Sequence, residues 1–79
     1  MQEYTTTNER MTALEALYRQ LSIAERTRFE LDYKRAAYPE GSREHAATTA
    51  TMRCVQYRVN SLSDNIQILE EMLGIVRRD

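Results

Sequence analysis

The chain has 79 residues and a formal net charge of -1, and it contains one proline, one cysteine and one histidine. A chain of this length forms at most one domain, so residues 1–79 are treated as a single unit. Cys54 has no second cysteine for an internal disulfide, and His45 alone gives no metal-ligand spacing. Small scaffolds without these cross-links are commonly stabilised by oligomerisation, so we expect association with itself or with another chain.

Charges of both signs are mixed along the chain. The densest basic stretch alternates with acids, as Arg26, Arg28, Lys34 and Arg35 are interleaved with Glu25, Glu30 and Asp32. This pattern is typical of a solvated helix face and argues against a nucleic-acid partner. The polar N-terminus does not resemble a signal peptide, and no apolar run approaches the roughly 20 residues that cross a bilayer. We therefore expect a cytoplasmic protein with no membrane insertion.

The first predicted helical arm spans residues 8 to 37, after a disordered segment at residues 1–6. Thr6 and Glu9 fit a capping box, and an apolar face follows at Met11, Leu14, Leu17, Tyr18 and Leu21. Ser22 to Glu25 fits a second capping box, after which the apolar phase changes through Phe29, Leu31, Tyr33, Ala36 and Ala37. Two interpretations stay open: two helices with a bend at Ser22, or one helix in which this serine faces water.

A turn is predicted at residues 38–42, where Pro39 and Gly41 interrupt the helical pattern. Ser42 can cap the next helix, and Glu44 in its first turn suits the positive end of the helix dipole. The second arm is expected at residues 43 to 77, with Gly74 only weakening its end. The predicted fold is all-α: an antiparallel helical hairpin with coiled-coil-like packing, or three helices if the first arm breaks.

The second arm carries an apolar stripe with alternating spacings of three and four residues. Its members are Met52, Val55, Val59, Leu62, Ile66, Leu69, Leu73 and Val76. This spacing is that of a coiled-coil seam, and it meets Thr48 and His45 when extended backwards, so we expect the seam to begin near residue 52.

A second stripe, Ile68, Met72 and Ile75, runs beside the first. Because a helix with one packing neighbour needs one stripe, two stripes indicate that residues 62 to 76 contact two neighbours. The alternative is a helix buried more deeply in its own core. The predicted partner-binding set is Leu62, Ile66, Ile68, Leu69, Met72, Leu73, Ile75 and Val76.

Chemistry-bearing residues do not form a catalytic pattern. His45 beside Glu44 is interpreted as a solvated side chain, and Cys54 as a buried or interface thiol. Glu70 and Glu71 have no histidine at helical spacing, and no glycine-rich phosphate loop occurs. We expect neither enzymatic activity nor a cofactor or metal.

Three segments resemble the small co-chaperones of type III secretion needle subunits. Residues 12–17 (TALEAL) are similar to the opening helix of that family, and Pro39 to Gly41 falls at its short polar turn. Residues 61–69 (SLSDNIQIL) resemble its C-terminal run, although Ser63 stands where the family has glutamate. The resemblance implies a bacterial cytoplasmic protein that pairs with a second chaperone and helps to keep the needle subunit from polymerising. A homodimeric coiled-coil or bundle scaffold, for example a phage-related or regulatory protein, is the alternative.

Overall fold

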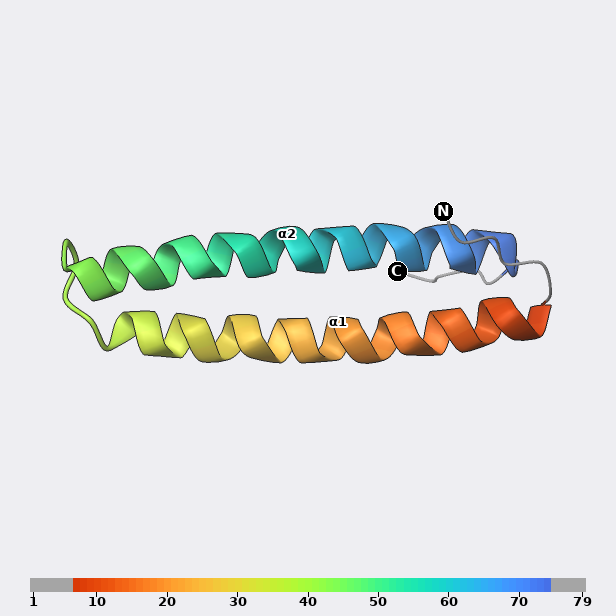
Figure 1. Cartoon of the computed structure of the whole chain (residues 1–79), viewed down its shortest axis with the longest axis horizontal. Helices are drawn as coiled ribbons and strands as arrows, with labels where there is room; N and C mark the ends of the chain where they lie inside the picture. The colour runs from red at the N-terminus through yellow and green to blue at the C-terminus, as the bar shows by residue number, and fades with distance from the viewer. Residues whose placement is uncertain (1–6, 75–79) are drawn as a thin grey trace.

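The computed structural model describes residues 7–74, which form two long antiparallel helices. Helix α1 spans Thr7–Ala36 and helix α2 spans Arg43–Met72, and the two lie side by side along their length (Figure 1). The predicted all-α helical hairpin is therefore confirmed. The predictions of disorder at residues 1–6 and of a capping box at Thr6 lie outside the described residues.

Helix α1 is continuous, so the bend considered at Ser22 does not occur. Leu21 and Ala24 lie on either side of this serine, and both pack against α2 in one apolar cluster. A bend between them would separate two side chains that share the same neighbours. The apolar phase that we predicted after residue 25 is wrong, because Phe29 and Tyr33 are 72% and 79% exposed. The face toward α2 instead continues at heptad spacing, with Arg28, Leu31 and Arg35 partly buried.

The predicted cap of the second helix is present at Ser42. Its Oγ accepts a hydrogen bond from the backbone N–H of His45 at 3.1 Å, and its extended backbone allows the chain to enter the helix from the turn. Gly41 has a φ of +84°, which a residue with a Cβ rarely adopts. Together these two residues set the point at which the chain reverses.

Helix α2 ends at Met72, so the predicted extension of this helix through residues 73 and 74 is wrong. Leu73 is the capping residue, and Gly74 follows with a φ of +72°. The Gly74 N–H donates to the carbonyl of Glu71 at 3.1 Å, which satisfies one of the free carbonyls of the last turn. Gly74 therefore stops the helix rather than merely weakening it. Ile75 and Val76 lie outside the described residues.

The core is a single layer between the two helices. One cluster joins Leu14 to Ile66 and Leu69, and a second joins Ala24 to Val59 and Leu62. Leu17 and Leu21 contact both clusters and make them continuous.

The seam also extends further toward the turn than we predicted. Thr48 is only 8% exposed, and its hydroxyl donates to the carbonyl of Glu44 at 2.8 Å. That bond within the helix lets a threonine occupy a buried seam position, because its polar group is satisfied there.

Candidate binding surface

The structure divides the predicted partner-binding residues into two groups. Leu62, Ile66 and Leu69 are 7%, 0% and 3% exposed, because they pack against α1 of the same chain. Leu73 is partly buried against the Leu14 cluster. The expectation that these four side chains meet a partner must therefore be corrected: they close the hairpin. Ile68 and Met72 remain on the surface, 54% and 45% exposed.

Helix α1 contributes to the same side of the hairpin as Met72. A shallow groove between the helices is lined by Gln20, Ile23 and Thr27 of α1 and by Arg58 of α2. Residues seven positions apart share a side of a coiled-coil helix. Ala13 and Ala16 therefore lie on the side of Gln20 and Ile23, and Asn65 and Met72 on the side of Arg58.

We call this surface the open face. Its ten members are Ala13, Ala16, Gln20, Ile23 and Thr27 from α1 and Arg58, Ser61, Asn65, Ile68 and Met72 from α2. Arg58 is the single charged residue among them. Depletion of charge distinguishes the centre of a protein–protein interface from ordinary surface. Ile23 on α1, which is 61% exposed, adds a third large apolar side chain to Ile68 and Met72 of α2. The open face thus combines low charge with exposed branched aliphatic residues.

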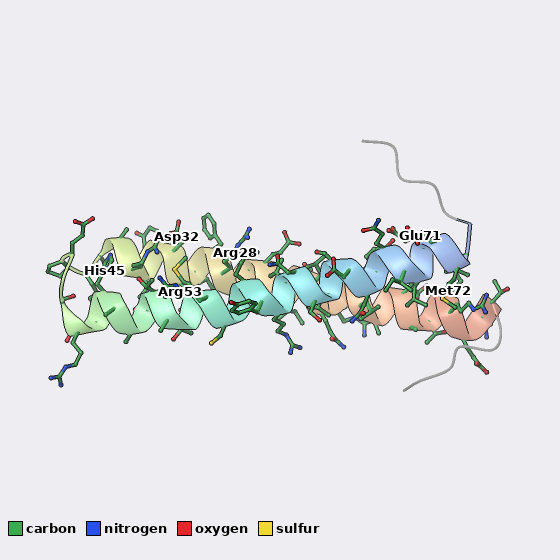
Figure 2. The ribbon with its side chains drawn as sticks, turned by 90° about the horizontal axis from the view of Figure 1, so that it is seen from above. Arg28, Asp32, His45, Arg53, Glu71 and Met72 are labelled. Atoms are coloured by element: carbon green, nitrogen blue, oxygen red, sulfur yellow. The ribbon has the colours of Figure 1, made fainter. Side chains whose placement is uncertain are left out.

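The opposite side of the hairpin is held by polar contacts between the helices. The Tyr18 hydroxyl donates to Glu70 Oε2 at 2.5 Å, and Glu70 is only 5% exposed. Arg28 Nη1 donates across the helices to Gln56 Oε1 at 2.7 Å, and within α2 Gln56 Nε2 donates to Asn60 Oδ1 at 2.9 Å. We call this side the polar face. Figure 2 shows Arg28 and Asp32 on one side of the ribbon and Met72 toward the other.

The burial of Glu70 was not predicted, although the sequence carries a signal for it. Thr49, Gln56, Ser63 and Glu70 recur every seven residues beside the seam, and all four are partly or fully buried. Such a polar repeat marks the edge of a helix–helix contact, where side chains bond across the seam. Tyr18, which the sequence analysis placed on the apolar face of the first arm, also bonds to Glu70 through its hydroxyl.

Two grooves at the helix edges, both lined by residues within 7–74, are smaller than a small-molecule site. The groove at Ile23 has a volume of about 140 Å³, and one on the polar face, lined by Arg53, Gln56, Tyr57 and Asn60, has about 220 Å³. Ligand pockets usually measure 300 Å³ or more, on the order of 300–1,000 Å³. Cys54, expected to be buried or at an interface, is exposed in the hairpin.

Residues 7–74 contain neither a cluster of metal-ligating side chains nor a helix that could cross a membrane. The histidine, cysteine and carboxylate side chains in this range form no group of three or more able to hold a metal ion. Neither α1 nor α2 has the length and apolar character required of a membrane-spanning helix. Comparison of the chain with protein-family models, curated proteins and solved structures gave no match. Within residues 7–74, the open face is the candidate site that the exposure of its apolar side chains supports.

Proposed function

We propose that this protein is a non-enzymatic helical binding protein that covers an apolar helix of a partner with its open face. The observation that carries the proposal is the exposure of Ile68 and Met72 on a helix whose seam is already filled by α1. Each of these side chains leaves apolar surface in contact with water, and its burial against a partner is favourable by about 25 cal/mol per Å². The partner supplies a second apolar surface for α2.

The open face suits this role because the hairpin holds it in place before a partner arrives. Leu14, Ile66 and Leu69 fix the two helices against each other, and Tyr18 with Glu70 joins them on the opposite side. A preformed surface loses less conformational freedom on binding than a flexible segment does. Met72 has an unbranched, adaptable side chain that fits partners of imperfectly matched shape.

The more specific form of the proposal is a co-chaperone of type III secretion in the bacterial cytoplasm. Its support is the resemblance of residues 12–17, the turn at Pro39 and residues 61–69 to that family. In this role the protein pairs with a second chaperone and helps to keep the needle subunit from polymerising. Residues 61–69 include Ile68, so the segment that carries the resemblance overlaps the open face.

The proposal is tested by replacing Ile68 and Met72 with glutamate. The parent or the Ile68→Glu, Met72→Glu variant is co-expressed with a type III needle subunit and its second chaperone, and the complex is isolated by size-exclusion chromatography. We expect the parent to co-elute with the chaperone and the variant to elute without it, because unpaired charge would be buried in the interface. Circular dichroism should show both proteins helical, since the new carboxylates lie in water in the hairpin.

A matched control uses an exposed apolar pair outside the open face. Phe29 and Tyr33 are 72% and 79% exposed on α1, and Phe29→Glu, Tyr33→Glu adds the same charge. This control should bind like the parent. If the Ile68→Glu, Met72→Glu variant binds equally well, the open face is not the partner site. If the parent itself captures neither secretion protein, the secretion role is wrong.

A further inference from the structure

The hairpin is more elongated than a compact folded chain of the same length. Its Cα radius of gyration is 16.4 Å, whereas a compact chain of this length has about 12 Å. The reason is that two helices of 30 residues each, about 45 Å long, pack in a single layer. Only one stripe of each helix is buried in this arrangement. The molecule has the shape of half a four-helix bundle.

The open face forms a second row on each helix, one residue before each position of the buried seam. Its residues on α1 are separated by three, four, three and four positions, from Ala13 to Thr27. Its residues on α2, from Arg58 to Met72, follow the same alternation. At 100° per residue this second stripe lies roughly a quarter of a turn from the buried seam. A helix in a four-helix bundle contacts its second neighbour in that direction.

Large and small side chains of the open face lie at matching heights along the hairpin. Leu14 packs against Ile66 and Leu69, so the neighbouring Ala13 and Ala16 lie level with Ile68. Ala24 packs against Val59 and Leu62, so Ile23 lies level with Ser61. Each isoleucine of one helix is thus level with small residues of the other. Interlocking of large and small side chains is how helix layers fill space without voids.

We propose that two copies of this chain pack open face to open face around a two-fold axis parallel to the helices. Rotation about such an axis keeps every residue at its height and places α1 of one copy against α2 of the other. Ile68 then fits over the partner's Ala13 and the partner's Ala16, and Ile23 fits over the partner's Ser61. Because the contact is isologous, each of these fits occurs twice.

The whole side of the hairpin that carries the open face is large enough for a stable dimer. The open face itself, within residues 13–27 and 58–72, is about 22 Å long and about 20 Å wide, hence about 440 Å². A two-fold axis parallel to the helices brings together the full hairpin length of about 45 Å, hence about 900 Å². A standard interface buries about 800 Å² on each partner. A two-fold axis perpendicular to the helices would instead place α1 against α1 and α2 against α2 of the other copy. Ile68 would then no longer face Ala13 and Ala16. The dimer uses the face of the proposed function, so the two complexes exclude each other, but neither proposal depends on the other.

The pairing of α1 with the other copy's α2 is tested by disulfide trapping in a Cys54→Ser background. One chain carries Ala16→Cys and a second, distinguished by a tag, carries Ile68→Cys. The two are refolded together and mildly oxidised. We expect a reducible, mixed disulfide dimer in the mixture and little cross-linking in either chain alone. Phe29→Cys mixed with Tyr57→Cys, both outside the open face, is the control and should cross-link only at the slow collisional rate.

A second measurement does not depend on thiols. Ala16→Trp fills the space that Ile68 of the other copy occupies, and it should raise the dimer dissociation constant by roughly tenfold or more. Helicity should be retained, since Ala16 is exposed in the hairpin. Sedimentation equilibrium measures the change. Rapid self-cross-linking of the Ala16→Cys chain alone would indicate α1 against α1 and overturn the parallel arrangement. If the parent protein is still monomeric at about 100 µM, the proposal of a dimer is wrong.

Discussion

Ile66 and Ile68 are the same residue type, two positions apart on α2, in opposite environments. Ile66 is fully buried against α1, and Ile68 is 54% exposed. A helix turns by about 200° over two residues, so one partner helix cannot cover both. Hydrophobicity alone therefore does not assign a residue to folding or to binding. The seam around Ile66 holds the hairpin together, and the stripe with Ile68 is left for another chain.

Truncating each isoleucine separately tests the different roles of Ile66 and Ile68 most directly. Ile66→Ala should lower the free energy of unfolding by about 2–5 kcal/mol, because it removes buried contacts and leaves a cavity. Ile68→Ala should change it by about 0.5 kcal/mol or less, as for other exposed positions. Urea denaturation followed by circular dichroism, at protein concentrations below those of self-association, measures both. Equal losses for the two variants would mean that the stripes do not have separate roles.

A second prediction sharpens the contrast between the two long sides of the hairpin. Tyr18→Phe removes the hydroxyl that donates to the buried Glu70, and it should cost about 1–3 kcal/mol of folding stability. Tyr57→Phe is the matched control, because Tyr57 is 76% exposed, and it should be almost neutral. Thermal and urea denaturation of both variants give the difference. If Tyr18→Phe is neutral, the polar face is not held by this bond.

The smallest expected effect concerns the two serines that begin capping-box sequences. Ser42→Ala should destabilise the hairpin by about 1 kcal/mol, because the N–H of His45 loses its acceptor at the start of α2. Ser22→Ala lies inside the continuous α1, where alanine is the better helix former, and it should be neutral or stabilising by a few tenths of a kcal/mol. Parallel thermal melts compare the two. A larger loss at Ser22 would indicate that α1 is interrupted there in solution.

Patterns that depend on neighbouring residues were predictable from the sequence. The alternating spacing of three and four from Met52 to Leu73 defined the buried stripe of α2, because helical geometry places those side chains on one side. Pro39 and Gly41 located the reversal, and Ser42 located the helix start, because each acts through its own backbone or through a neighbour three residues away. These features hold in any fold that keeps the local chain helical.

Other features were decided only when α1 and α2 came together. Ser22 follows a capping-box pattern, but the packing of Leu21 and Ala24 on α2 keeps the helix straight through it. Phe29 was expected on the buried phase, yet Arg28 lies toward α2 and bonds to Gln56. Glu70 is buried at a place where Tyr18, 52 residues away in the chain, donates a hydrogen bond to it. The sequence by itself determined the helices, the turn and two candidate stripes on α2. The tertiary structure decided which stripe is buried, because that depends on the height and rotation at which α1 meets it.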